Sequence, residues 1–353
     1  MKIKKEKILM SGNEAMAEAA IKAGCYFYAG YPITPQNEIP TYMARRMKEE
    51  KRVFIQAESE LAAINMVFGA AAAGMRALTS SSSPGISLKQ EGISYIAGAE
   101  LPAVIINVMR GGPGLGNIGS SQSDYFQATR GGGHGDYYTP VLAPWSAQEA
   151  AHLVMLSFDL ADYYRTPVLI LADAITGQMM EPVIMPLKSE FKKKIPPKPW
   201  ALTGAKARQQ NIAKSFFLKE GALEIHNQKL KKKWEEIKKN EQRFHSYKAD
   251  DAKYLIVAYG SEARIAWEVV DMLRGENLKV GLFRPISLWP YPDSGLQKYA
   301  RNVKKIFVVE QSLGQMLDDV KLALPGKEIK FFGKTGGGIP SASEIIKFVK
   351  KAL

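Results

Sequence analysis

The chain has 353 residues, of which 46% are hydrophobic and 24% charged, and its formal net charge at pH 7 is +13. This composition is typical of a globular protein long enough for two domains. No apolar run approaches the roughly 18 residues of a membrane span, and the apolar stretch at 8–10 is far too short for a secretory signal. We therefore expect neither a membrane span nor a signal peptide, and a cytoplasmic location.

The positive charge is concentrated in one segment. Residues 186–248 contain 15 Lys and 2 Arg against 6 Glu. Such a segment can bind nucleic acid, but no helix-turn-helix or aromatic-interleaved pattern accompanies it, so nucleic acid is not expected as a partner. A solvated connector, or a surface that docks an acidic partner, fits the pattern better.

Cysteine and histidine are scarce. The single cysteine, Cys25, can form neither an intrachain disulfide nor the four-thiolate shell of an iron–sulfur cluster. The histidines lack metal-ligand spacing; they are His134, His152, His226 and His245. We therefore expect no metal site in this chain, and electron transfer would need metal centres from another chain.

Residues 1–185 alternate short apolar runs with helical patterns. The predicted strands lie at 7–12, 25–32, 53–58, 76–83, 103–110 and 167–173. The predicted helices lie at 13–24, 35–50, 59–75, 87–101 and 146–165. This alternation predicts a parallel α/β sheet, in which ligands bind at the carboxyl ends of the strands.

The rhythm breaks over residues 186–250. A proline- and lysine-rich linker at 192–200 precedes one long charged helix, predicted over 222–247, with Leu230, Trp234 and Ile237 on one face. Alternation then returns, with predicted strands at 252–260, 278–286, 304–312 and 329–337 and a helix at 261–276. The chain is thus divided into residues 1–185, a connector at 186–250, and a smaller α/β domain at 251–353.

The phrase Tyr31-Pro-Ile-Thr34-Pro35 follows a predicted strand. Two prolines end the ladder, so the chain must turn and present Tyr31 and Thr34 at the carboxyl edge of the sheet. One interpretation is structural, with Thr34 as the N-cap and Pro35 as the first residue of the next helix. A hydroxyl in that position can also face a ligand.

Glu58 and Glu60 open an alanine-rich helix, where the helix dipole favours a carboxylate. This capping effect alone explains both residues. The small residues at 69–74 also allow close packing, as at a domain or subunit interface, and so favour Glu60 as a functional carboxylate.

Arg110 ends a buried predicted strand and precedes a glycine-rich loop at 111–116. An arginine there suits bidentate capture of a carboxylate, while the glycines permit close backbone approach without matching a P-loop or dinucleotide fingerprint. The serine run at 80–83 ends another strand at the same edge, where it either touches a ligand or caps the next helix. The glycines near Gly336 predict a turn.

Together these phrases resemble the 2-oxoacid:ferredoxin oxidoreductases. The resemblance rests on YPITP at 31–35, Glu60, TSSSSPG at 79–85, Arg110 and RGGGHGDY at 130–137, and it covers essentially the whole chain. It is closest to the alpha subunit of the branched-chain, 2-oxoisovalerate type. It implies a thiamine diphosphate-enzyme pyrimidine-binding domain followed by a transketolase-C-like domain.

The resemblance also implies roles for single residues. Glu60 would hydrogen-bond the aminopyrimidine of thiamine diphosphate as the catalytic group, with Tyr31 and Pro32 beside the cofactor. Thr34 and Arg110 would hold the 2-oxoacid, Arg110 through its carboxylate. The products would be an acyl-coenzyme A and CO2, and ferredoxin would be reduced.

Two family features are missing here: a Gly-Asp-Gly…Asn stretch for Mg²⁺ and the diphosphate, and a cysteine cluster. In the family they belong to partner chains. The resemblance therefore implies a thiamine diphosphate-binding beta subunit with Mg²⁺, a gamma subunit, and a ferredoxin-like delta subunit with iron–sulfur clusters. The thiamine site would then lie across a subunit interface.

Three alternatives remain at this point. A 2-oxoglutarate-specific relative shares these motifs but needs a further cation, and the sequence does not place Arg76 or Arg130 in the pocket. A subunit of an NAD-linked 2-oxoacid dehydrogenase is disfavoured by YPITP and Arg110. A non-catalytic scaffold subunit is disfavoured because Glu60, Thr34 and Arg110 are present together.

Overall fold

Seven short strands form the larger sheet of the computed structural model, which describes residues 7–353. They are β2 (Phe27–Gly30), β3 (Val53–Gln56), β4 (Ala77–Ser81), β5 (Ala103–Met109), β6 (Val141–Leu142), β7 (Pro167–Asp173) and β12 (Ser287–Trp289). The spatial order is β12-β6-β7-β5-β4-β2-β3, and every neighbouring pair except β12–β6 is parallel. The predicted parallel α/β sheet is confirmed, with one antiparallel strand added at its edge.

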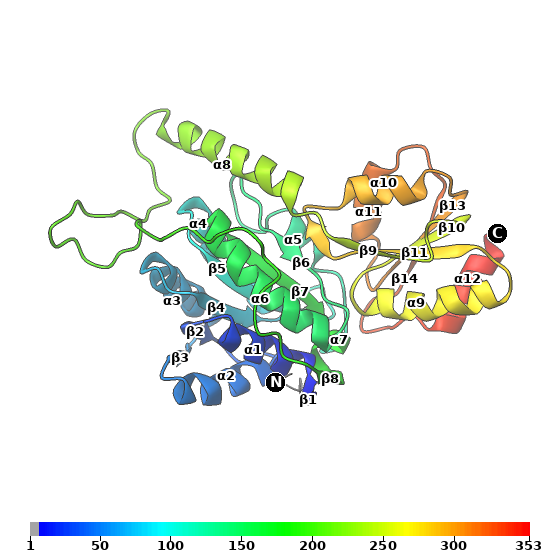
Figure 1. Ribbon diagram of the computed structural model, residues 1–353, viewed down its shortest axis with the longest axis horizontal. Coiled ribbons are helices and arrows are strands. Elements are labelled where there is room, and N and C mark those ends of the chain that lie inside the picture. The colour runs from blue at the N-terminus through cyan, green and yellow to red at the C-terminus, as the bar shows by residue number, and fades with distance from the viewer. Residues whose placement is uncertain (1–6) are drawn as a thin grey trace, which may run out of the picture.

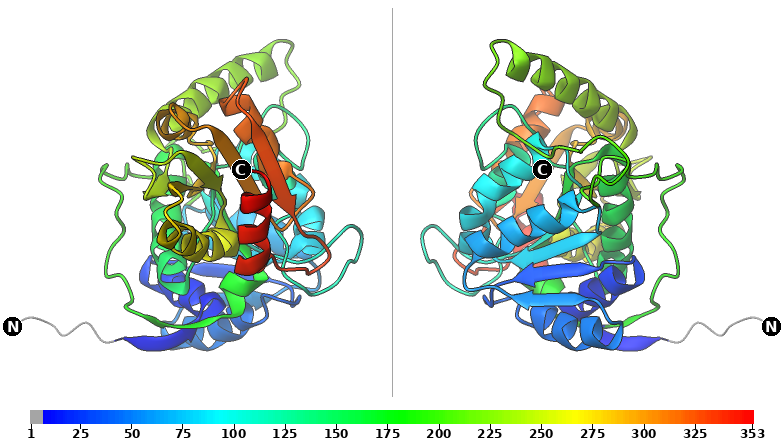
Figure 2. Two further views of the ribbon diagram at one scale, coloured as in Figure 1. Left: turned by 90° about the vertical axis from the view of Figure 1, so that its right-hand side faces the viewer. Right: turned by 90° about the vertical axis from the view of Figure 1, so that its left-hand side faces the viewer.

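Two groups of helices pack on this sheet (Figures 1 and 2). They are α1 (Gly12–Lys22), α2 (Glu38–Glu49) and α6 (Ala147–Tyr164) in one group, and α3 (Glu60–Ala72) and α4 (Ser83–Gly98) in the other. Parallel crossovers are right-handed, so the step outward from β2 to β3 and the return from β3 to β4 place α2 and α3 on opposite faces. The short helices α5 (Tyr125–Thr129) and α7 (Ala174–Gln178) follow β5 and β7.

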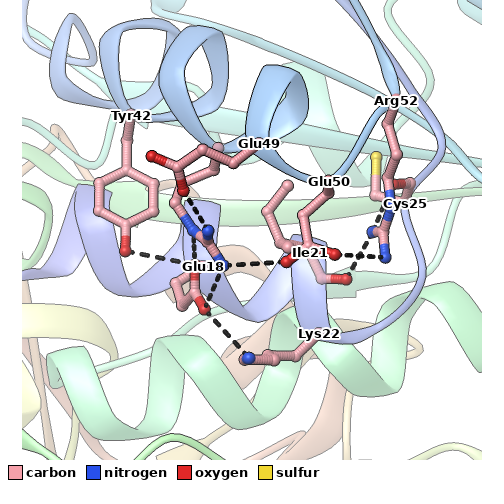
Figure 3. Close-up of polar contacts among 9 residues, drawn as sticks. Glu18, Ile21, Lys22, Cys25, Tyr42, Glu49, Glu50 and Arg52 are labelled. Atoms are coloured by element: carbon pink, nitrogen blue, oxygen red, sulfur yellow. Dashed lines mark hydrogen bonds and ion pairs between the residues drawn. The ribbon is translucent and has the colours of Figure 1, made fainter.

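A polar cluster fixes α2 against α1 (Figure 3). The Glu18 carboxylate accepts hydrogen bonds from Tyr42 Oη at 3.2 Å and Arg46 Nε at 3.0 Å. Beyond the end of α2, Arg52 Nη1 donates to the carbonyl of Ile21 at 2.7 Å. These contacts join α1 to the body of α2 and to the residue that precedes β3.

A second, smaller sheet has the order β14-β13-β10-β11-β9. Its strands are β9 (Phe244–Tyr247), β10 (Tyr254–Val257), β11 (Val280–Pro285), β13 (Lys305–Glu310) and β14 (Ile329–Gly333), of which only β9 runs antiparallel to its neighbour. Its helices are α9 (Gly260–Gly275), α10 (Asp293–Ala300), α11 (Gln315–Ala323) and α12 (Ala342–Lys351). Figure 1 shows this unit, yellow to red, beside the larger one.

The chain passes between the two units through a long connector. β8 (Met180–Val183) pairs antiparallel with β1 (Ile8–Ser11), so the strand predicted at the start of the chain lies outside the larger sheet. Residues 184–221 then contain no helix or strand, and Figure 1 shows part of this stretch as a loop that reaches away from the body. α8 (Ala222–Asn240) follows it and buries the predicted face of Leu230, Trp234 and Ile237.

The prediction that this helix continues to residue 247 is wrong. The buried face of α8 ends at Ile237, and the Glu241 carboxylate accepts a hydrogen bond from Tyr164 Oη at 2.7 Å. The following residues leave the helix and form β9, which pairs with β11. Part of the predicted connector therefore belongs to the second sheet.

The two units are joined by backbone pairing as well as by packing. β12 leaves the second unit to pair with β6 of the larger sheet. Close to this junction, buried Gln122 exchanges hydrogen bonds with the backbone of Gln311 and donates to the carbonyl of Tyr259 at 2.9 Å. Within residues 7–353, no helix is long and apolar enough to cross a bilayer.

Candidate functional site

The carboxyl ends of the parallel strands meet at one edge of the larger sheet. Thr34 follows β2, Glu60 follows β3, Ser82 follows β4 and Arg110 follows β5. The chain goes from β2 outward to β3 and then returns to β4 on the other side of β2, so the strand order reverses between β2 and β4. Ligands of open α/β sheets bind at such a reversal. The Thr34 loop and the serine run flank it.

The loop at 31–37 is held by side chains that the sequence analysis did not identify. Buried Gln36 accepts from Ser80 Oγ at 2.5 Å, and Ser80 is also hydrogen-bonded to Tyr28 Oη at 2.7 Å. Asn13 Nδ2 donates to the carbonyl of Pro35 at 2.9 Å. These bonds tie the loop to β2, β4 and α1.

The same bonds explain why the predicted start of the helix at Pro35 is wrong. The helix does not begin at Pro35 with Thr34 as its N-cap: α2 begins at Glu38, and Asn37 is the N-cap. The Pro35 carbonyl is already bonded to Asn13, so the loop continues for three residues before the helix starts. Thr34 Oγ1 accepts from Asn37 Nδ2 at 3.1 Å. Tyr31 and Pro32 lie exposed on the outer side of this loop.

Glu60 is the first residue of α3, after the N-cap Ser59. It is only 6% exposed, and its carboxylate makes no side-chain hydrogen bond or ion pair with any residue between 7 and 353. A methyl group added at Gly85, in the first turn of α4, would lie 2.5 Å from Glu60 Oε1 and 2.1 Å from Ser81 Oγ. The carboxylate is thus pressed against the start of α4 with its bonding capacity unused.

The serine run contributes further unused polar groups. Ser82 occupies the N-cap position of α4, but its side chain makes no capping hydrogen bond, and α4 begins at Ser83 rather than at the predicted 87. The hydroxyls of Thr79, Ser81 and Ser82 are all buried without a partner. Buried polar groups are normally paired, so this cluster indicates a place where a ligand completes the bonding.

Arg110 links two of the predicted motifs. Its Nη1 donates to the carbonyl of Thr34 at 3.0 Å, and its Nη2 donates to the carbonyl of Leu115 in the glycine-rich loop at 3.1 Å. Arg110 Nε is buried without a partner. Arg110 and Thr34 therefore lie together as the sequence motifs suggested, whereas no hydrogen bond joins either of them to Glu60 among the described residues.

A cleft of about 400 Å³ opens beside these motifs, between the two units. It is lined by the start of α4, the glycine-rich loop and the turn of the second unit; among its residues are Ser83, Pro84, Gly112, Gly114, Thr335 and Gly336. Asn117 Nδ2 donates to the Gly336 carbonyl at 2.9 Å, which confirms that the glycines near 336 form a turn and places it against the loop.

Asp124 lies on the floor of this cleft. Its carboxylate accepts from Ser83 Oγ at 2.6 Å and Asn107 Nδ2 at 2.8 Å. Burial raises the pKa of Asp124, while the hydrogen bonds from Ser83 and Asn107 oppose the shift. The sequence analysis did not identify Asp124, because a single aspartate after a loop carries no distinguishing pattern.

The sequence left open whether Arg76 or Arg130 lies in the substrate pocket, and both lie away from the cleft. Arg76 precedes β4 at the opposite edge of the sheet and pairs with Asp159 at 2.6 Å and Asp162 at 2.8 Å. Arg130 pairs with Asp319 at 2.9 Å and lines a separate groove beside α8. Neither lines the cleft beside Arg110.

Lys89 is a further residue that the sequence analysis missed. It is fully buried on α4, and its Nζ has no hydrogen-bond partner in the described chain. A signal was present in the sequence, since Lys89 stands between Gly85 and Gly92 on the apolar face of a helix, where a lysine is unusual.

Comparison with known proteins gives a consistent result. Residues 18–247 match the family model described as pyruvate flavodoxin/ferredoxin oxidoreductase, thiamine diphosphate-binding, and residues 252–345 match pyruvate:ferredoxin oxidoreductase core domain II. Ketoisovalerate oxidoreductase subunit VorB of Methanothermobacter marburgensis is 46% identical, over 97% of both chains. 2-Oxoglutarate synthase subunit KorA of Methanothermobacter thermautotrophicus is 34% identical, over 98% of this chain and 99% of KorA.

A solved structure is similar in fold. The 2-oxoglutarate:ferredoxin oxidoreductase from Magnetococcus marinus, with 2-oxoglutarate, coenzyme A and succinyl-CoA bound, superposes with a TM-score of 0.87 at 26% identity. The alignment covers 98% of this chain but only 65% of the Magnetococcus chain. The likeness therefore includes both units of the fold described above.

Proposed function

This chain belongs to the pyruvate flavodoxin/ferredoxin oxidoreductase family, and we propose that it is the alpha-type subunit of a branched-chain 2-oxoacid:ferredoxin oxidoreductase. The family membership makes it a subunit of a 2-oxoacid:ferredoxin oxidoreductase with a thiamine diphosphate-binding first domain. The branched-chain assignment follows the higher identity to the ketoisovalerate subunit than to the 2-oxoglutarate subunits. The division into residues 1–185, 186–250 and 251–353 stays a prediction; β9 of the connector joins the smaller sheet, and β12 of the last segment joins the larger one. A cytoplasmic location also stays a prediction.

One observation supports the cofactor role of Glu60 above others. A nearly buried carboxylate with no hydrogen bond to the described chain stands at the strand-order reversal, beside three unpaired hydroxyls. These groups fit the polar aminopyrimidine of thiamine diphosphate, which, when bound, supplies the electron sink for decarboxylation. Glu60 would hold the proton at the ring nitrogen that it faces. Tyr31 and Pro32, on the outer side of the adjacent loop, would border the cofactor.

Arg110 and Thr34 would bind the 2-oxoacid. Arg110 has an unused Nε donor, and its Nη1 and Nη2 atoms each donate to a backbone carbonyl that a substrate carboxylate can replace as acceptor. Neither Arg76 nor Arg130 lines the cleft beside Arg110, so this chain offers no second arginine there for the distal carboxylate of 2-oxoglutarate. This supports a monocarboxylic, branched-chain substrate.

Other subunits would complete the enzyme. We infer that a beta-type subunit supplies Mg²⁺ and the diphosphate site, that a ferredoxin-like delta subunit supplies the iron–sulfur clusters, and that a gamma-type subunit completes the assembly. Coenzyme A, which is bound in the Magnetococcus structure, would accept the acyl group. The single buried cysteine, whose pKa burial raises to about 12, is unsuited to cluster ligation in this chain.

The stretch at 184–221 is suited to docking a partner. It carries exposed apolar side chains on a basic, irregular loop, among them Leu187, Ile212, Phe216 and Leu218. A second copy of the chain would bring like charges together, so an acidic surface with an apolar groove on a partner subunit fits better. Replacing Phe216 and Leu218 by serine should weaken assembly on a sizing column, whereas Leu322→Ser, an equally exposed control on α11, should leave it intact.

Calorimetry with thiamine diphosphate and Mg²⁺ tests the shared-site proposal. The lone chain should show no measurable binding, and addition of the thiamine diphosphate-binding subunit should create a stoichiometric site. Tight binding to the lone chain would contradict the proposal and indicate a self-sufficient enzyme. A complex that binds the cofactor but shows no oxoacid-dependent dye reduction would instead favour the non-catalytic scaffold.

A further inference from the structure

Lys89 is placed where a lysine is costly. Its side chain is fully buried, and its Nζ has neither a hydrogen-bond acceptor nor an ion-pair partner within 4 Å among the described residues. The other lysine with a strongly lowered pKa, Lys233, is half-buried and is bonded to Glu100 at 3.2 Å and to the Arg165 carbonyl at 3.0 Å. A buried ammonium without such bonds is strongly destabilising, so Lys89 needs an explanation other than stability.

The packing of α3 on α4 shows what lies next to Lys89. A methyl group added at Gly85 would lie 2.5 Å from Glu60 Oε1, and one added at Gly92 would lie 2.5 Å from a side-chain carbon of Ile64. Glu60 and Ile64 are one turn apart on α3, and Lys89 stands between Gly85 and Gly92 on the facing side of α4. Its stem therefore runs into the helix interface between the Glu60 and Ile64 contacts.

The electrostatics of this interface connect the two ionisable groups. Burial lowers the pKa of Lys89 to about 8, and the negative charge of Glu60 opposes that shift. Glu60 is the one charged group among the described residues that acts noticeably on Lys89. At neutral pH the ammonium form prevails, and it becomes neutral as the pH passes about 8.

We propose that Lys89 is a positioning residue for Glu60, its buried charge orienting the Glu60 carboxylate at the thiamine-binding edge. This inference rests on the function proposed above for Glu60. It assigns Lys89 no contact with the cofactor or the oxoacid. The lack of a direct bond from Lys89 leaves both Glu60 oxygens free for a ligand.

The electrostatic coupling between Lys89 and Glu60 can be measured in the isolated full-length chain, without an activity assay. The native pKa of Lys89 lies below the unfolded value of about 10.5, so the unfolded state holds more protons between pH 8 and 10.5 and stability rises over that window. Lys89→Met should remove this part of the rise. Glu60→Gln should lower the pKa of Lys89 further, which NMR of lysine labelled at Cε detects in a chain that retains Lys89. An unchanged Lys89 titration in Glu60→Gln would overturn the proposal, even if Lys89→Met fails to fold.

In the assembled enzyme, Lys89→Met should reduce turnover about tenfold at pH 7, with little change in the Michaelis constant. It should also remove the change in turnover that the proposal predicts for the wild type near pH 8. Lys233→Met is the matched control, because its pKa is likewise lowered to about 8 but its partner is Glu100, so its pH–rate profile should stay that of the wild type. An unaltered pH–rate profile in Lys89→Met would refute the coupling of Lys89 to Glu60. If the Lys89 titration responds to Glu60→Gln but the assembled complex shows no turnover, the proposed function is refuted and the coupling of Lys89 to Glu60 stands.

Discussion

Two glutamates stand at comparable places in the two sheets, and their surroundings differ. Glu60 follows β3 of the larger sheet and makes no side-chain hydrogen bond within the described chain. Glu310 ends β13 of the smaller sheet, is fully buried, and accepts from Ser312 Oγ at 2.9 Å and from the backbone N–H of Met316 at 3.0 Å and Leu317 at 2.9 Å. The bonds of Glu310 are complete within the chain, whereas Glu60 makes none within the described residues. The same side chain thus supports the fold in one unit, whereas in the other it is the residue that we propose for chemistry.

The largest effect should come from Glu60. Glu60→Gln removes the group that we propose holds the proton on the cofactor, and turnover of the assembled enzyme should fall at least about 100-fold. The free energy of unfolding should fall only slightly, because no hydrogen bond is lost and only the electrostatic attraction between Glu60 and Lys89 disappears. Glu58→Gln is the control and should keep near-normal turnover. Steady-state kinetics with chemical denaturation of the same preparations checks both, and normal turnover of Glu60→Gln would remove its catalytic assignment.

Glu310→Gln should show the opposite pattern. An amide placed against backbone donors loses acceptor capacity in a fully buried site, so the free energy of unfolding should fall by about 2 kcal/mol. Enzyme assembled from the surviving folded chain should keep its turnover per site. If denaturation shows unchanged stability while turnover collapses, the distinction between the two glutamates is wrong.

Arg110→Lys should have a moderate effect confined to the larger sheet. A point charge replaces a planar group that bonds the Thr34 loop and the glycine-rich loop, so the Michaelis constant for the 2-oxoacid should rise about tenfold. Thiamine diphosphate affinity, measured by calorimetry on the complex, should change little. A loss of cofactor affinity at an unchanged Michaelis constant would mean that Arg110 serves the cofactor rather than the substrate.

The smallest effect should come from Glu344, a carboxylate of the smaller unit whose bonds are complete. It lies in the capping box of α12 with Ser341, and the hydrogen bond from Lys334 at 2.7 Å is the first cause that lowers its pKa to about 2. The folded pKa lies below the unfolded value of 4.5, so the stabilisation is present above that pH and lost as the pH falls toward 2. Glu344→Gln should therefore lower stability at pH 7 but not at pH 2, as acid titration of the unfolding midpoint can test. An equal loss at both pH values would mean that the cap, not the charge, is responsible.

The alternation of apolar strands with helices was sufficient to predict five strands of the larger sheet, β2, β3, β4, β5 and β7, and the strand ends that precede Thr34, Glu60 and Arg110, but it missed β6 and β12. It could not predict the start of α2, because the Asn13 and Gln36 side chains that hold the preceding loop act over distances of 22 and 44 residues along the chain. β9 was predicted as helix because the charged residues before it continue the helical pattern of α8. Its pairing with β11 is a tertiary contact, which the local sequence pattern does not reveal. The roles of individual site residues stay predictions.

The sequence also could not predict which buried polar groups, in the serine run and at Lys89, lack hydrogen-bond partners. The serine run predicted either a ligand contact or a cap, and only the geometry separates these, since Ser82 makes no capping bond. Lys89 is visible in the sequence as a lysine on an apolar helix face, but its lack of a partner depends on the distance to Glu60 across the α3–α4 interface.

The return of β12 to the larger sheet limits how a gene for such a chain can be divided. A reading frame split after residue 250 would encode a first product whose β6 edge lies open, and a second product that exposes Leu288 and Trp289 of the displaced strand. An open edge and an exposed apolar strand both promote aggregation. We therefore expect the two units to be inherited as a single reading frame, and fusion or exchange of the second unit to succeed only when its donor also supplies a strand that fits against β6.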